Sequence, residues 1–240
     1  MISIAEFKED KLNKIIKDAL KENRYLLNEV ESKSLIKSFD IPVVNTKLAQ
    51  NVSQAKSIAS KLSFPLAMKI VSNDISHKSD VGGVQLDIAN IKEVESTYKA
   101  MIKRVKKVNS KAVIIGISIQ PMVEDGIELV AGVTTDKQFG PVLMFGLGGV
   151  FIEFMKDVSF KLLPLRKIDA KNIINEIQSK QLLMGARGLP KVDLDKLQKI
   201  LLSLSSFVVM NPEVEEIDLN PIIANEKKII AVDARIVLKK

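Results

Sequence analysis

The chain has 240 residues, of which 46% are hydrophobic, and this is enough for one large domain or two small ones with a packed core. It contains no cysteine, which excludes disulfides, thiolate metal sites and cysteine nucleophiles. Its formal net charge of +7 accompanies no tryptophan and only two tyrosines, so the basic patch with stacking aromatics that nucleic-acid binding requires is missing.

The opening stretch MISIAEFKEDKLNKII lacks the cationic start and continuous apolar core of a signal peptide. No run approaches the roughly 18 apolar residues of a membrane span. We therefore expect a soluble, cytoplasmic protein that contacts neither membrane nor nucleic acid.

The N-terminal part of the sequence predicts helices. Apolar residues at i, i+3 and i+4 spacing predict an amphipathic helix over residues 7–22. Asn28, followed three residues later by Glu31, resembles a capping box and predicts a second helix that ends near Phe39. Ser53 is expected to cap a third helix.

A short apolar run, residues 66–71, predicts a buried strand that contains Lys69. A buried ammonium is costly unless an anion meets it, and a nucleotide phosphate is such an anion. The alternatives are that Lys69 extends to solvent or pairs with a carboxylate.

The loop after this strand contains the only histidine, His77, then Lys78 and the paired Gly82 and Gly83. Glycines let backbone amides approach a phosphate closely, although a plain hairpin also favours them. A neutral imidazole can attack phosphorus or exchange protons. An ordinary solvated histidine is the alternative. A strand is predicted next, over residues 84–88.

The middle of the chain indicates a division into two lobes. A helix over residues 91–107 and a strand over 112–119 lead to Gln120-Pro121-Met122-Val123, where the proline should stop sheet pairing and form a hinge. We therefore predict a first lobe over residues 1–120 and a second over residues 121–240.

The second lobe is predicted to be rich in antiparallel strands. A strand over residues 127–133, which includes Glu128, should pair back on the preceding one. Further strands are expected over 141–145, 150–154 and 158–165, and helices over 169–178 and 193–207. Because βαβ repeats and a strand-GxGxxG-helix motif are missing, the pattern predicts an α+β fold.

The C-terminal stretch allows a prediction of strand register. If residues 225–228 form a four-residue turn, the numbers of opposed residues add to 453 and Asn220 lies opposite Asp233. Asp218 shares this face through the period of two. Such oxygen ligands suit Mg²⁺, which phosphate oxygens and water usually complete. Surface acidity balanced by Arg235 is the alternative.

Five features follow one another in a specific order: the lysine strand, HKSDVGGV, QPMV, FGPVLMFGLGG, and DLNP with VDAR. Together they resemble the ATP-grasp β subunit of the ADP-forming acyl-CoA synthetases, over about residues 28–238; the succinyl-CoA synthetase β subunit is a more distant relative. The resemblance implies an ATP-grasp fold, in which two lobes hold ADP or ATP with Mg²⁺ between antiparallel sheets. It also implies a CoA-binding α subunit as partner, most simply in an α2β2 assembly.

The resemblance further implies a phosphohistidine relay, in which an α-subunit histidine passes a phosphoryl group to His77 and His77 passes it to ADP. It assigns to the nucleotide Lys69, Gln120, Pro121, Met122, Val123 and Glu128, and to Mg²⁺ Asn220 and Asp233. To these we add Lys78, Gly82 and Gly83 at the phosphates and Asp218 at the metal, whereas Glu153 and Arg187 receive no assigned role.

The expected enzyme is thus an acid-thiol ligase that is incomplete without its α subunit. Two alternatives stay open. One is another ATP-grasp carboxylate ligase, which would not need a relay histidine. The other is a non-catalytic nucleotide-binding subunit, in which the site residues could be replaced without loss of function. The sequence leaves open the acyl group, the choice of ADP or GDP, and the stoichiometry with the α subunit.

Overall fold

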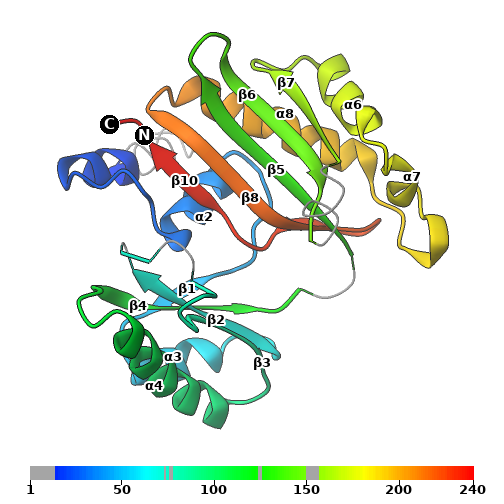
Figure 1. The fold of residues 1–240 in the computed structure, drawn as a ribbon. Coiled ribbons are helices and arrows are strands. Elements are labelled where there is room, and N and C mark those ends of the chain that lie inside the picture. The colour runs from blue at the N-terminus through cyan, green and yellow to red at the C-terminus, as the bar shows by residue number, and fades with distance from the viewer. Residues whose placement is uncertain (1–13, 73, 76–77, 124–125, 150–156) are drawn as a thin grey trace, which may run out of the picture. The chain divides into compact units, whose positions relative to one another are not determined.

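The computed structural model describes residues 14–72, 74–75, 78–123, 126–149 and 157–240. Contacts divide the chain into two compact units (Figure 1). The smaller unit comprises Asn28–Val30 and Val44–Val123, and the larger unit comprises the described residues of Met1–Leu27, Glu31–Val43 and Glu124–Lys240. Each unit has its own hydrophobic core.

This division differs from the predicted lobes at the N-terminus. The chain leaves the smaller unit after Val123, close to the predicted boundary at residues 120 and 121. The N-terminal helices, however, belong to the larger unit, because Ile16, Leu35 and Ile36 are buried in its core.

The smaller unit is a four-stranded antiparallel sheet in the order β1-β4-β2-β3, with two helices on one face (Figure 1). Its elements are β1 (Lys47–Ala49), α3 (Val52–Ala59), β2 (Leu66–Ser72), β3 (Val84–Ile88), α4 (Ile91–Val108) and β4 (Ile114–Pro121). Val94, Tyr98, Met101 and Val105 recur every three or four residues and bury one face of α4. The predicted buried strand around Lys69 is confirmed, because every residue of β2 is buried.

Two details of the smaller unit correct the predictions. The N-cap of α3 is Asn51 rather than Ser53, because the Asn51 side chain accepts a hydrogen bond from the Gln54 N–H at 2.9 Å. Sheet pairing also continues to Pro121, which pairs with Leu66. Pro121 lies beyond Ile119, the last β4 residue that pairs with β1, and a proline is tolerated at such an edge.

The larger unit is a six-stranded antiparallel sheet in the order β10-β8-β5-β6-β7, with β9 paired to β8. Its strands are β5 (Ile127–Asp136), β6 (Gly140–Leu147), β7 (Val158–Leu162), β8 (Val214–Ala224), β9 (Ile229–Ala231) and β10 (Arg235–Leu238). Strand β5 does not pair back on β4 as predicted; it pairs with β6 and β8, because the chain enters the other unit after Val123. The predicted strand over 150–154 lies outside the described residues.

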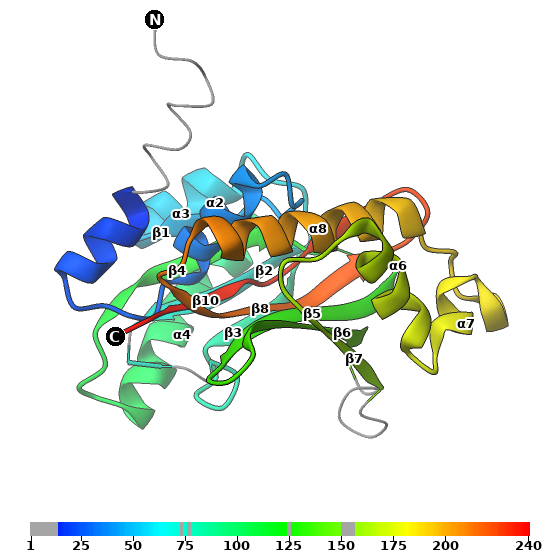
Figure 2. The same ribbon diagram turned by 90° about the horizontal axis from the view of Figure 1, so that it is seen from above.

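Helices cover one face of the larger sheet. They are α6 (Lys167–Glu176) and α8 (Leu194–Met210), and Figure 2 shows α8 running along this face; the short α7 (Lys180–Leu183) follows α6. Helix α2 (Glu29–Ser38) starts with residues of the smaller unit and continues in the larger one, and residues 14–21 are also helical. The α+β prediction is confirmed. Among the described helices, none has the length and apolar character needed to cross a membrane.

Residues 25–27 pair with β10 in the larger unit. The Leu27 N–H donates to the Ile236 carbonyl at 3.0 Å, the Leu238 N–H donates to the Tyr25 carbonyl at 2.6 Å, and Leu26 forms a bridge with Val237. Residues 25–27 therefore extend the sheet beyond β10.

Candidate functional site

Lys69 is buried, with 7% of its surface exposed, and it meets a carboxylate. Its Nζ donates to Oε1 of Glu29 at 3.0 Å. Glu29 is the first residue of α2 and is 4% exposed, and a negative charge is favoured at a helix N-terminus. The carboxylate pairing that the sequence left open is therefore present.

The same carboxylate binds two further side chains. Lys78 donates from Nζ to Glu29 Oε2 at 3.3 Å, and the Ser118 hydroxyl donates to the same oxygen at 3.2 Å. Ser118 lies directly opposite Lys69 in the β2–β4 ladder. We call Glu29, Lys69, Lys78 and Ser118 the Glu29 cluster; its two lysines and one carboxylate carry a net positive charge, as an anion site requires.

The glycines of the loop are required by close packing. A Cβ on Gly83 would lie 2.6 Å from Cγ2 of Ile70 and 2.8 Å from the Lys78 carbonyl oxygen. Gly82 has a φ of +64°, which other L-residues rarely adopt. The Gly83 N–H donates to Lys78 O at 2.7 Å and the Gly82 N–H donates to Ser79 O at 3.0 Å, so both amides already serve the loop itself.

The predicted hinge, residues 120–123, is anchored to the smaller unit. Gln120 is 1% exposed, and its Oε1 accepts a hydrogen bond from the Thr46 hydroxyl at 2.9 Å. Met122 accepts one at its Sδ from the Asp87 N–H at 3.1 Å, whereas its own N–H donates to Pro65 O. Residues 120 and 122 are therefore attached to the smaller unit by two side-chain hydrogen bonds and one backbone hydrogen bond.

In the larger unit the predicted register of the C-terminal hairpin is confirmed. Residue numbers add to 453 in all three β8–β9 pairs, in the Val232 N–H to Pro221 carbonyl bond, and in the β8–β10 pairs from Arg235 to Val237. Asn220 and Asp233 lie between these pairs and so oppose each other. Ile217 and Leu219 point into the core, which leaves Asp218 and Asn220 on the opposite face.

Electrostatics at this face fit a divalent cation. Burial and the nearby carboxylates of Glu216 and Asp233 raise the pKa of Asp218, against the opposing effect of Arg235. Arg235 forms an ion pair with Glu216 at 3.1 Å. Part of the acidity is therefore balanced by Arg235, which was the alternative to a metal site. Within the described residues no three His, Cys, Asp or Glu side chains are grouped to hold a metal, so Mg²⁺ here would need the Asn220 amide, phosphate oxygens and water.

Glu128 lies in β5 with an exposed side chain, close to the glycine-rich run. A Cβ on Gly149 would lie 2.5 Å from Glu128 Oε2, and the Gly148 N–H donates to the Glu128 carbonyl at 2.8 Å. The glycines at positions 148 and 149 thus let the chain pass close to this carboxylate.

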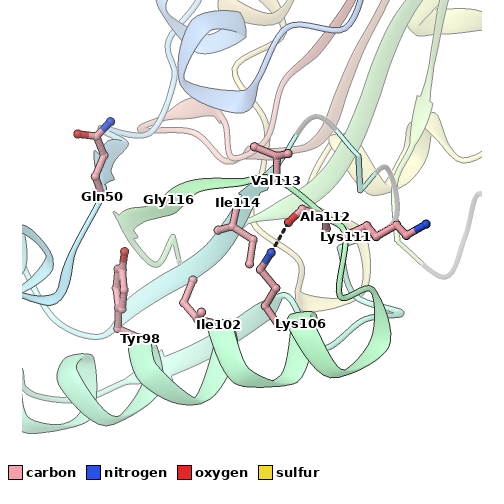
Figure 3. Close-up of a pocket in the computed structure, with 9 residues that line it drawn as sticks. All are labelled: Gln50, Tyr98, Ile102, Lys106, Lys111, Ala112, Val113, Ile114 and Gly116. Carbon is pink, nitrogen blue, oxygen red and sulfur yellow. Dashed lines mark hydrogen bonds between the residues drawn. The ribbon is translucent and has the colours of Figure 1, made fainter.

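A pocket of about 510 Å³ lies between α4 and the start of β4 (Figure 3). Its lining residues are Gln50, Tyr98, Ile102, Lys106, Lys111, Ala112, Val113, Ile114 and Gly116, none of which is a predicted site residue. Lys106 donates to the carbonyls of Ala112 at 2.7 Å and Ser110 at 3.3 Å. The Lys106 ammonium is therefore engaged by backbone carbonyls beside the pocket.

Three residues considered from the sequence have no described side chain. His77 and Glu153 lie outside the described residues, as does the side chain of Arg187. Conversely, Glu29 and Ser118 were missed. Their only sequence signal was the expectation that a buried lysine has a carboxylate partner, which does not say where in the chain that partner lies.

Comparison with known proteins gives one consistent result. An ATP-grasp domain family matches residues 18–238. The chain is 41% identical, over 95% of its length and 98% of the relative, to the Pyrococcus furiosus protein named acetate–CoA ligase [ADP-forming] I subunit beta.

Solved structures agree with these relatives. A Ca. Korarchaeum cryptofilum acetyl-coenzyme A synthetase 1, in complex with coenzyme A and Ca-AMPCP, has a TM-score of 0.91 at 42% identity, covering 94% of this chain and 99% of that one. The same synthetase with coenzyme A and Mg-AMPPCP, described with its phosphohistidine segment pointing towards the nucleotide-binding site, has a TM-score of 0.84 at 38% identity and covers 95% and 100%.

Proposed function

Because the chain belongs to the ATP-grasp family and, within it, to the β subunits of the ADP-forming acetate–CoA ligases, we propose that it is the nucleotide-binding subunit of an ADP-forming acyl-CoA synthetase. The complete enzyme converts acyl-CoA, ADP and phosphate into carboxylic acid, CoA and ATP. The observation that carries the proposal is the buried Lys69 beside the glycine loop, in a chain that matches such a subunit along nearly its whole length.

In this proposal His77 relays the phosphoryl group. A ring nitrogen of His77 bonds to phosphorus as the bond from phosphorus to a histidine of the partner subunit breaks. A terminal oxygen of ADP then attacks the same phosphorus, and the imidazole of His77 leaves. Lys69 and Lys78 supply positive charge to the phosphate oxygens, because such transfer depends on placement and charge stabilisation. The Korarchaeum relative is described with a phosphohistidine segment that points towards its nucleotide-binding site, which supports a phosphohistidine relay in this type of enzyme.

Other residues bind and orient the nucleotide. We assign the adenine to residues 120–123, the nucleotide also to Glu128, and Mg²⁺ to Asn220, Asp218 and Asp233. Bound Mg²⁺ would neutralise phosphate charge. Gly82 and Gly83 let the loop close tightly below the phosphates.

The partner in this proposal is a CoA-binding α subunit, since the relatives are named as β subunits. We propose an α2β2 assembly in the cytoplasm, where ADP and CoA are available. The acyl group is expected to bind mainly to the α subunit.

The experiment that tests the function is covalent labelling. The complex reconstituted with its CoA-binding subunit is incubated with γ-labelled ATP and Mg²⁺ under single-turnover conditions. We expect an acid-labile, base-stable label on this chain, as a phosphorus–nitrogen bond gives. His77→Ala should lose both the label and acyl-CoA-dependent ATP formation.

Two outcomes would contradict the relay. No label on the wild-type chain, or full turnover by His77→Ala, would return His77 to an ordinary loop residue. ATP consumption with a carboxylate and a different acceptor, without label on this chain, would favour another ATP-grasp ligase. Nucleotide binding without any turnover would favour a non-catalytic subunit.

A further inference from the structure

We infer that Glu29 is a positioning residue, which sets Lys78 and the loop of residues 78–83 for phosphoryl transfer. The inference deepens the proposed function and rests on it. It starts from a buried carboxylate that neither the nucleotide assignment nor the metal assignment uses, although it touches both lysines assigned to the phosphates.

Both carboxylate oxygens of Glu29 accept hydrogen bonds. Oε1 accepts from Lys69 at 3.0 Å, and Oε2 accepts from Lys78 at 3.3 Å and from Ser118 at 3.2 Å. Two ammonium groups repel each other, and the carboxylate that contacts both offsets this repulsion. Glu29 therefore holds together two cations that come from different segments of the chain.

Lys78 also closes the base of the loop. Its carbonyl accepts from the Gly83 N–H at 2.7 Å, and the Gly83 carbonyl accepts from the Ile70 N–H at 2.7 Å. The side chain of Lys78 is thus tied to β2 through Glu29 and Lys69, and its backbone is tied to β2 through Gly83 and Ile70. Lys78 directly follows His77 in the sequence, so this double attachment fixes the chain one residue from the proposed relay.

The negative charge of Glu29 affects nucleotide affinity, whereas its placement of Lys78 affects the rate of phosphoryl transfer. Replacing the carboxylate by an amide leaves both lysines positive and removes the negative charge that opposes a phosphate. Nucleotide affinity should then stay the same or rise. The transfer step should slow, because a small misplacement of reacting groups lowers the rate strongly. A positioning role therefore predicts a fall in kcat without a rise in KM for ADP.

The test uses the complex reconstituted with its CoA-binding subunit. For Glu29→Gln we expect kcat for acyl-CoA-dependent ATP formation to fall about tenfold, with KM for ADP unchanged or lower. Glu31→Gln is the matched control: it removes the same charge from the same helix, where Glu31 pairs with Arg24 at 3.0 Å. Its kcat and KM should stay within about twofold of wild type.

A double-mutant cycle tests whether Glu29 acts through Lys78. Glu29→Gln should change kcat by less than about twofold in a Lys78→Met background, because the residue it positions is already gone. If the two losses multiply instead, Glu29 does not act through Lys78 and the inference is overturned. If Glu29→Gln unfolds below the assay temperature, the Lys78→Met variant alone is the test, and its kcat should fall about tenfold. A wild-type kcat for Lys78→Met would overturn the inference.

Failure of the inference can be told apart from failure of the function. A wild-type complex that forms no ATP from acyl-CoA refutes the proposed function and this inference with it. A wild-type complex that turns over, together with a Glu29→Gln variant whose kcat is within about twofold of it, refutes the inference alone.

Discussion

Asp233 tests the metal site at the scale of one residue. We expect Asp233→Ala to weaken Mg²⁺-dependent ADP binding at least about tenfold, because it removes a charged oxygen ligand opposite Asn220. The fold should persist, since Asp233 is only half-buried and its Oδ1 accepts from the adjacent Ala234 N–H. Isothermal calorimetry with and without Mg²⁺ measures the effect.

Glu226→Ala is the control for Asp233→Ala, because Glu226 is an exposed carboxylate in the turn of the same hairpin. It should leave ADP·Mg²⁺ affinity unchanged. Equal affinity in both variants would show that the face bearing Asn220 and Asp233 does not bind the metal.

The burial and the strand face of single residues were predictable from the sequence where the local hydrophobic pattern determines them. Lys69 stands in an apolar run, so its burial could be expected, and the paired carboxylates and amide of the hairpin follow from strand period and turn length. Glu29 could not be assigned to Lys69, because 40 residues separate them and no local pattern joins α2 to β2. The Asn28 and Glu31 pattern predicted a helix cap, and the Asn28 side chain does accept a hydrogen bond from the Val30 N–H at 3.0 Å at the start of α2, while Glu31 pairs with Arg24.

At the scale of elements, Asp157 joins the start of β7 to the α6–α7 connection. It is 5% exposed and accepts from the N–H groups of Gln178 and Ser179, each at 2.7 Å, and from the Ser179 hydroxyl. Burial alone would raise its pKa, but these bonds outweigh it and hold the pKa of Asp157 below its ordinary value of 3.8.

Asp157→Asn should therefore lower the free energy of unfolding by about 1–3 kcal/mol at pH 7, because an amide N–H₂ group replaces one acceptor oxygen. A carboxylate whose pKa is lowered by folding stabilises the protein fully at pH values above its ordinary, unfolded-state pKa. This stabilisation is lost as the pH falls through the folded-state pKa. The difference between wild type and variant should thus shrink below about pH 4.

Urea unfolding at pH 7, 5 and 3.5 measures this difference, with the exposed Asp195→Asn as a control expected to change stability by less than about 0.5 kcal/mol. A difference that stays constant across all three pH values would show that the Asp157 charge contributes nothing.

Helices and strands were predicted well where hydrophobic period decides them, as for α4, α8, β2 and the C-terminal hairpin. Their partners were harder to predict. Strand β5 was expected to pair with the strand before it, whereas it pairs with β8, which begins about 80 residues further along the chain. Sheet partners over such separations depend on how whole layers pack, which local pattern does not contain.

At the scale of the whole molecule, we expect this chain to copurify with a CoA-binding subunit when the two are co-expressed. Light scattering should give the mass of an α2β2 assembly. The isolated chain should bind ADP·Mg²⁺ but form no ATP, because the proposed function assigns the site for CoA and the acyl group to the partner. His77→Ala should assemble like wild type, since a relay residue need not hold subunits together. Recovery of this chain alone would contradict the proposed partnership.

The division into units was only partly predictable from the sequence. The QPMV motif indicated a change of lobe near residue 120, and the chain does leave the smaller unit after Val123. The assignment of the N-terminal helices to the larger unit had no sequence signal, because their apolar faces suit any core.

The bridge between residues 25–27 and β10 has a consequence for how the protein is made. A ribosome adds about 5–20 residues per second, so the partner strand of residues 25–27 emerges on the order of ten seconds or more after them. Val44–Val123, by contrast, is continuous and can fold while synthesis proceeds. The nascent chain therefore holds residues 25–27 without their strand partner until β10 has been synthesised, and this interval is when a chaperone would be most useful to it.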